Sequence, residues 1–250
     1  MRYSRRNPTT LRKMKLDSST VSLVLVGKFS PGDFSIESFV KTHSIGDEDA
    51  AQARYEAFVR DQVCDIRFHW GKFAVVDQKL VIEVNEAPYI RASDLALKCL
   101  RELSQGAVVR QMGINYQAFF AANSEERDAV GRRLVPPKNW GMWGNQVAES
   151  LNFGISDPRH GGMTAAALRQ GKPDDRPAGH IDARVEPANR DSVWGVLVSI
   201  NDHYEMPKGR DGKLVPDRTA TGTLLDALEE AFDKSVARSI EIARQIMEAT

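Results

Sequence analysis

The sequence of 250 residues is short of cysteine, of net charge and of long hydrophobic runs. Its two cysteines, Cys64 and Cys99, cannot form the disulfide framework of a small secreted protein, so we expect two buried thiols in a reducing compartment. Lys plus Arg and Asp plus Glu both number 34, and this balance predicts no strong general attraction to nucleic acid or anionic membranes. The longest apolar run, 21–26, is too short to span a bilayer, and the basic start precedes no signal-peptide core. We therefore expect a cytoplasmic protein without a membrane segment.

Motifs of the common enzyme classes are absent as well. The sequence contains no Walker A loop, no G-x-G-x-x-G, no G-x-S-x-G, no H-E-x-x-H and no C-x-x-C pair. These absences weaken the usual enzyme hypotheses, although a site made of scattered residues stays open. No cofactor is indicated by any motif.

The apolar residues, 42% of the chain, are enough to build a substantial core. Their spacing predicts strands at 21–29, 64–68, 73–76, 79–84, 108–120, 147–155, 180–187 and 192–201. Helices are predicted at 47–60, 93–103, 124–134 and 223–247, and a long loop at 156–179. This pattern predicts an α+β fold with a mostly antiparallel sheet and helices packed on one face.

The order of these elements is similar in the two halves of the chain. Each half follows the order βαβββα, which predicts two related units at 16–105 and 106–250, after a flexible arm at 1–15. The alternative is one continuous domain, because no residue-level repeat accompanies the order.

The arm at 1–15 contains six basic residues and no acidic one. Such a terminus is either a solvated tail or a segment that contacts a phosphate backbone or an acidic partner. Arg5, Arg6, Arg12 and Lys13 are the candidate nucleic-acid contacts.

Polar side chains alternate with apolar ones along the last predicted hairpin. A turn at Asn189-Arg190 would place His180 opposite Ser199 on the side away from the core, with Asp182 and His203 on that same side. Two histidines and an aspartate could bind a divalent metal or perform acid–base catalysis. The simpler interpretation is the solvated face of an antiparallel sheet.

Two tryptophans, Trp140 and Trp143, lie in a predicted glycine-bearing loop after Pro136-Pro137. Tryptophans in such a position are typical of a protein interface, and they could equally close one end of the core. Neighbouring Arg132, Arg133 and Lys138 also leave single-stranded nucleic acid as an alternative ligand.

Three segments, at 22–27, 113–116 and 198–205, together resemble an uncharacterised family of bacterial proteins of similar length. The resemblance covers nearly the whole chain and implies a bacterial, cytosolic α+β protein. It implies no activity and no catalytic residue.

Taken together, the sequence favours a cytosolic binding or regulatory protein over an enzyme, with a protein partner or a second copy of itself as ligand. Two alternatives stay open. One is a metal-dependent hydrolase or nuclease that uses His180, Asp182 and His203, and the other is a nucleic-acid-binding protein that uses the arm at 1–15.

Overall fold

A computed structural model of the chain describes residues 14–76, 78–149, 162–175, 177–206 and 216–248. The candidate contacts Arg5, Arg6, Arg12 and Lys13 lie outside the described residues, as does almost all of the arm to which they belong.

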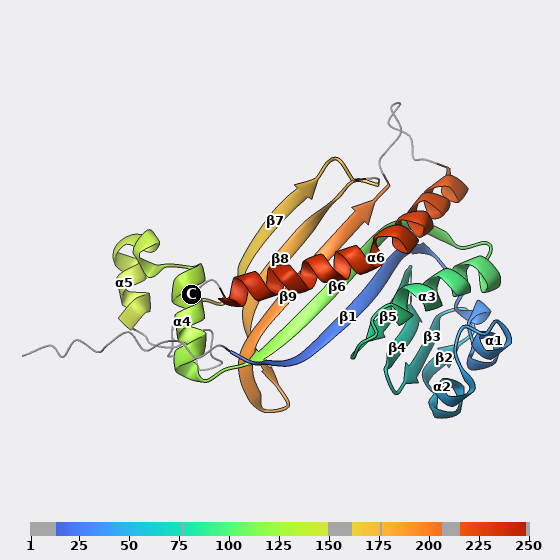
Figure 1. The fold of residues 1–250 in the computed structure, drawn as a ribbon, viewed down its shortest axis with the longest axis horizontal. Coiled ribbons are helices and arrows are strands. Elements are labelled where there is room, and N and C mark those ends of the chain that lie inside the picture. The colour runs from blue at the N-terminus through green and yellow to red at the C-terminus, as the bar shows by residue number, and fades with distance from the viewer. Residues whose placement is uncertain (1–13, 77, 150–161, 176, 207–215, 249–250) are drawn as a thin grey trace, which may run out of the picture.

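Nine strands in the described part of the chain form one continuous antiparallel sheet, in the order β2-β3-β4-β5-β1-β6-β9-β8-β7 (Figure 1). They are β1 (Leu16–Lys28), β2 (Arg54–Val59), β3 (Val63–Phe68), β4 (Gly71–Val76), β5 (Lys79–Val84), β6 (Val108–Ala121), β7 (Ala166–Lys172), β8 (Gly179–Arg190) and β9 (Val193–Glu205). The predicted fold class, α+β with an antiparallel sheet, is therefore confirmed.

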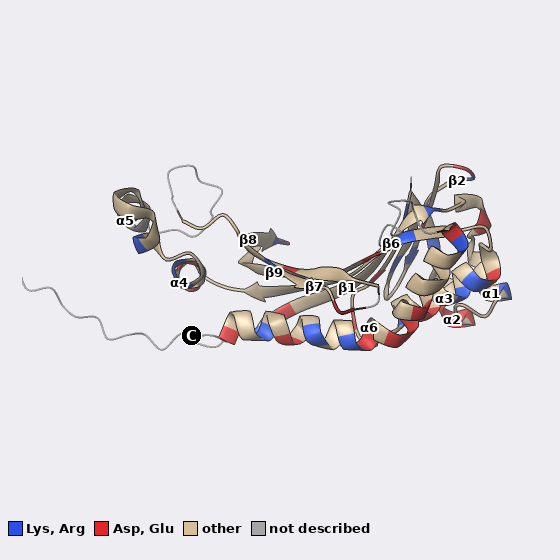
Figure 2. Cartoon of the chain, turned by 90° about the horizontal axis from the view of Figure 1, so that it is seen from above, with Lys and Arg blue, Asp and Glu red and all other residues tan. Residues whose placement is uncertain are grey.

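Helices lie on one side of this sheet and at one of its ends (Figure 2). They are η1 (Pro31–Asp33), α1 (Ile36–Lys41), α2 (Asp47–Gln52), α3 (Arg91–Lys98) with its π-helical continuation η2 (Cys99–Leu103), α4 (Ser124–Leu134), η3 (Pro137–Trp140), α5 (Gly141–Glu149) and α6 (Asp217–Glu248). The long α6 crosses the sheet over β6 and β9, while α4 and α5 lie beyond the sheet at one end. None of the described helices combines the length and the apolar character that a membrane span requires.

The sheet order is the same in both halves of the chain, read outward from the centre. In each half, the first strand (β1 or β6) pairs with the last (β5 or β9), and the closing helix (α3 or α6) packs on these two strands. The first half has one strand more, β2, in a segment where the sequence predicted a helix over 47–60. That helix ends at Gln52, because backbone pairing of β2 with β3 overrides the weak helical preference of residues 54–59.

Two further local predictions are wrong. Residues 141–149, which include the predicted glycine-bearing loop and the start of a predicted strand at 147–155, form α5, and the rest of that strand lies outside the described residues. The predicted loop at 156–179 contains the edge strand β7, whose residues are mostly exposed and therefore lack the apolar alternation of a central strand.

The last hairpin forms as predicted, but its turn lies two residues later. Asp191 and Ser192, with φ of 48° and 69°, make the two-residue turn, and Arg190 pairs with Val193. β8 therefore continues two residues further and β9 begins two residues later than predicted, so His180 lies opposite His203 instead of Ser199. Because the total shift is an even number of residues, the side to which each residue points is unchanged.

Candidate functional site

Trp140, Met142 and Trp143 form an exposed apolar cluster where η3 ends and α5 begins, which we call the tryptophan patch. These residues are 55%, 83% and 61% exposed, and the two indole rings meet edge to face with their centroids 5.8 Å apart. Large apolar side chains that gather on a protein surface often mark an interaction site. The sequence prediction that Trp140 and Trp143 close one end of the core does not fit this exposure.

The patch is held by a close contact between η3 and α5. Gly141 has a φ of +62°, a conformation that favours glycine, and it begins the helix. At Gly144 a Cβ atom would lie 1.9 Å from the carbonyl oxygen of Pro137, so only glycine lets the two elements approach. The geometry of this short unit therefore depends on its glycines.

The preceding helix α4 is attached to the body of the protein. Asn123 and Glu126 form a reciprocal capping box at its start. The buried Arg127 donates to the carbonyl oxygen of Ala122 at 2.9 Å, and its guanidinium lies over the ring of Trp194. At the other end of α4, Arg133 donates to the carbonyl oxygen of Ile246 in α6. The helix that precedes the patch is thus attached to both β9 and α6.

The second candidate site is the imidazole pair, His180 on β8 and His203 on β9. Their ring centroids are 4.7 Å apart on the side of the sheet away from α6. His180 Nε2 lies 3.5 Å from Asp182, and both carboxylate oxygens of Asp182 accept hydrogen bonds from Arg169 on β7, at 2.6 and 2.8 Å. The structure therefore brings together His180, Asp182 and His203, the three residues predicted to bind a metal or to act in catalysis.

The pKa values of His203 and of the neighbouring Asp182 are both lowered, for different reasons. Burial, and secondarily the charge of His180, lowers the pKa of His203, whereas the hydrogen bonds from Arg169 lower the pKa of Asp182. Two neighbouring imidazoles can offer two nitrogen ligands to one cation. Among the described residues, however, no group of three or more His, Cys, Asp or Glu side chains is arranged to hold a metal ion.

The surroundings of the imidazole pair are those of a solvated sheet face. One residue from each of the nine strands forms a single cross-strand row next to the pair, and all nine are polar. In sheet order they are Arg54, Arg67, Lys72, Glu83, Ser22, Asn115, Asn201, Asp182 and Arg169. Such a row is typical of the open face of a sheet whose other face is covered by helices.

The lowered pKa of His203 predicts that acid destabilises the fold. The unfolded chain binds a proton at the ordinary histidine pKa, which is higher than the folded one, so the free energy of unfolding should fall as the pH drops from about 7.5 to 5.5. His203→Gln should remove part of this fall, as measured by urea unfolding at both pH values. Ser199→Gln introduces the same residue on the same side of β9 without removing a titratable group, and it should keep the pH dependence of the wild type. An unchanged slope in His203→Gln would contradict the prediction.

A cluster of buried charges lies on the opposite side of the same strands. Asp202 is fully buried beneath α6 and accepts hydrogen bonds from Lys172 of β7, from Arg238 and from Ser235, the last at 2.7 Å. Lys172 Nζ also lies 3.4 Å above the ring of Tyr204, and burial, followed by the charge of Asp202, raises the pKa of Tyr204 to about 12. The cluster joins β7, β9 and α6.

Sequence reasoning missed this buried cluster. Asp202 follows Val196, Val198 and Ile200 in the inward positions of β9, and a charge in such a series signals a buried partner. Nothing local marks Lys172 and Arg238 as those partners, since they lie 30 and 36 residues away.

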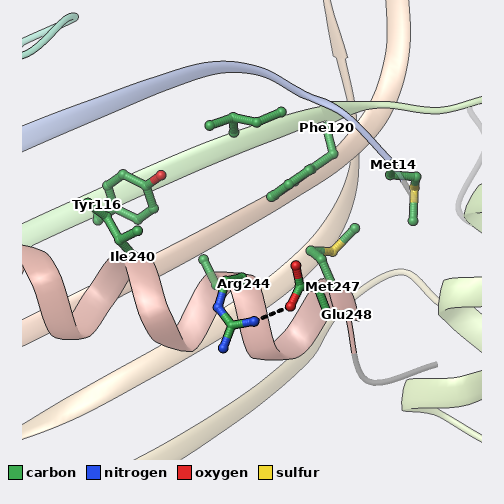
Figure 3. Close-up of a pocket in the computed structure, with 9 residues that line it drawn as sticks. Met14, Tyr116, Phe120, Ile240, Arg244, Met247 and Glu248 are labelled. Atoms are coloured by element: carbon green, nitrogen blue, oxygen red, sulfur yellow. Dashed lines mark hydrogen bonds and ion pairs between the residues drawn. The ribbon is translucent and has the colours of Figure 1, made fainter.

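An apolar pocket of about 250 Å³ lies at the C-terminal end of α6, close to the start of β1 and the end of β6 (Figure 3). Leu16, Phe120, Ile240 and Met247 are among the residues that form its walls, and the ion pair between Arg244 and Glu248 also lines it. No prediction from the sequence pointed to this pocket.

Comparison with known proteins adds no relative from which a function could be transferred. No protein-family model matches the sequence, and no curated protein matches it significantly.

Proposed function

We propose that the chain is a bacterial, cytosolic binding or regulatory protein that acts through protein contacts, with the tryptophan patch as its contact surface. The observation that carries this proposal is the exposure of Trp140, Met142 and Trp143, each more than half open to solvent where η3 meets α5. Tryptophan is enriched among the residues that dominate binding energy at protein interfaces.

The chemistry next to the patch favours a protein partner over single-stranded nucleic acid. A nucleic-acid strand would need cations free to follow its phosphates beside the stacked bases. Arg132 instead pairs with Asp128 in its own helix, and Arg133 is engaged by the carbonyl oxygen of Ile246. Lys138 of η3 is exposed, but a single cation does not make a track for a phosphate backbone. An apolar partner surface needs no such cations.

The alternative of a metal-dependent hydrolase or nuclease has less support. His180, Asp182 and His203 lie together, but both oxygens of Asp182 already accept hydrogen bonds from Arg169. Two imidazoles without a third ligand are a weak basis for a catalytic metal. The nucleic-acid alternative depends on the arm at 1–15, most of which lies outside the described residues.

The proposal predicts that protein binding depends on the two indoles. Full-length wild type, Trp140→Ala/Trp143→Ala and the control Leu168→Ala are immobilised separately and exposed to the same host extract. Leu168 is a suitable control because it is 82% exposed on β7, outside the patch. We expect one or more proteins, a second copy of this chain included, to be retained by wild type and control and lost from the double variant.

Each retained protein is then purified and titrated against the same three baits. A loss of affinity of at least about tenfold in the double variant alone is expected, since truncated interface tryptophans commonly cost more than about 1–2 kcal/mol. If no protein requires the two indoles, the proposal is wrong.

A further inference from the structure

A pocket of about 700 Å³ lies between α3 and the corner at 42–46 that joins α1 to α2. These elements lie at the end of the molecule opposite to α4 and α5, so this pocket is separate from the tryptophan patch (Figure 1). Its volume is within the range of about 300–1,000 Å³ that is usual for small-molecule sites. Such a site combines an apolar floor with a few polar groups that orient the ligand, and both parts are present here.

The buried side chains that line the pocket are apolar. They belong to Ile45, Trp70, Leu95 and Leu97. Trp70 is held in one orientation, because its Nε1 donates to Asp49 Oδ1 at 3.0 Å and its ring stacks on Phe68 with the ring centroids 4.7 Å apart. These four side chains form a fixed surface for the apolar part of a ligand.

The wall between α1 and α2 is fixed by the way α1 ends. Ser44 N–H donates to the carbonyl oxygen of Phe39 at 2.8 Å, and His43 N–H donates to that of Val40 at 2.9 Å, which together make a Schellman motif. His43 has a φ of 52°, the left-handed conformation in which glycine is usual at this position. Lys98 of α3 donates to the carbonyl oxygen of His43 at 2.6 Å and so ties the two walls together.

The opposite wall, α3, changes at Cys99–Leu103 into the π-helix η2. π-helical turns are rare, and they are frequent at functional sites. Arg101 in this turn donates two hydrogen bonds to Glu229 of α6, at 2.6 and 3.4 Å, and both residues line the pocket. Both walls therefore have an irregular backbone at residues that face the pocket.

Four charged side chains of the lining have no ion pair within the part of the chain that the structure describes. Two are carboxylates, Asp47 and Asp94, and two are cations, Arg91 and Lys98. Asp94 lies three residues after Arg91 and four before Lys98, a spacing at which opposite charges on a helix commonly pair, yet it pairs with neither. The guanidinium of Arg91 lies instead over the indole of Trp70, 5.7 Å from the ring centroid. The pocket thus offers a ligand both signs of charge.

We propose that this pocket binds a small zwitterion, an α-amino acid with an apolar side chain. Arg91 and Asp94 lie one helical turn apart on α3, a spacing that leaves about 5–6 Å between Cβ atoms. They can therefore reach the two charged groups of an amino acid, which are bonded to the same carbon atom. The guanidinium of Arg91 offers parallel N–H groups to the carboxylate, and the carboxylate of Asp94 accepts from the ammonium group. The apolar side chain packs on the floor beside Ile45.

The charges of the lining disfavour other ligands of this size. A nucleotide or another polyanion would bring its phosphates close to Asp47 and Asp94, and juxtaposed like charges are costly. An organic cation without an anionic group would meet Arg91 and Lys98 in the same way. A wholly apolar ligand would take these charges out of water without giving them a partner. One positive and one negative group on an apolar body meet all three conditions.

Isothermal titration calorimetry of the full chain with leucine, isoleucine, valine, methionine and phenylalanine tests the proposal. We expect at least one of these amino acids to bind at up to millimolar concentration. Two analogues of that amino acid, one without its carboxylate and one without its amino group, should bind at least about tenfold more weakly, because each loses one charge-assisted contact. For leucine these analogues are isopentylamine and 4-methylpentanoate.

Substitutions in the pocket locate the binding site. Arg91→Gln and Asp94→Asn should each weaken binding by about tenfold or more. Arg54→Gln and Asp233→Asn make the same two changes at exposed positions outside the pocket, and they should bind as the wild type does. Circular dichroism and thermal melting check that every variant folds.

Three results would overturn the proposal. They are the absence of binding by all five amino acids at millimolar concentration, an analogue with a single charge that binds as tightly as its amino acid, and binding that is unchanged in both Arg91→Gln and Asp94→Asn. None of them bears on the proposed function, because no residue of the tryptophan patch lines this pocket.

Discussion

Replacing Asp202 by asparagine should lower the free energy of unfolding by about 3–5 kcal/mol, because the change removes the buried counter-charge of Lys172. The other carboxylate beside Lys172, that of Asp175, lies 3.4 Å away and is 39% exposed, so it compensates only weakly. The substitution affects Lys172 more than Arg238, since the Lys172 side chain is only 5% exposed and its ammonium group has little access to water. The guanidinium of Arg238 is better solvated, with 39% of its side chain exposed. Urea unfolding at neutral pH measures the loss.

A second substitution shows whether the unpaired charge of Lys172 causes the loss of stability. Asp202→Asn combined with Lys172→Met removes the buried ammonium group along with its partner, so most of the lost stability should return. Glu205→Gln, a change of the same charge at an exposed position of β9, should have an effect within about 0.5 kcal/mol. A double variant as unstable as Asp202→Asn would show that the stability lost has another origin.

Val198→Asp should prevent stable folding. Val198 is fully buried in β9, between Ala118 of β6 and Val185 of β8, on the side covered by α6. An unpaired carboxylate at this position has no counter-charge, and burying one costs more than about 4 kcal/mol, a large part of the stability of an ordinary domain. We expect little soluble protein, and no cooperative thermal transition in whatever is recovered.

Ser199→Asp supplies a matched control for that change. The next residue of β9 points to the opposite, polar side of the sheet, between Gln117 and Arg184. The same new charge there should change stability by no more than about 0.5–1 kcal/mol. Comparable damage from both substitutions would contradict the assignment of the two sides of β9.

The central part of the fold could be predicted from the sequence, and the edges of the sheet could not. β1, β6 and β9 have buried residues at alternating positions, so the spacing of their apolar side chains shows the period of two that is typical of a strand. The edge strand β2 is exposed along its whole length, and β7 almost so. Such strands are held by backbone pairing to a neighbour, which leaves no apolar pattern to detect.

The candidate sites show the same division between local and distant information. The side of the sheet to which His180 and His203 point depends only on alternation, so it was predicted correctly although the turn was misplaced. The tryptophan patch was recognised from its composition but placed in a loop, because glycines at 141 and 144 argue against a helix. The partners of Asp202 come from distant elements, and no local pattern identifies them.

The position of β1 in the middle of the sheet has a consequence for biosynthesis. A ribosome completes β1 to β5 before β6 emerges, and in that interval β1 is the outermost strand of the half-formed sheet. Its free edge then displays unpaired backbone groups along a strand that carries Val21, Leu23 and Leu25. During synthesis, this apolar strand is therefore exposed to aggregation until β6 has been translated and can pair with it. Chaperone binding or slow elongation near residue 108 would have its largest effect on folding during that interval.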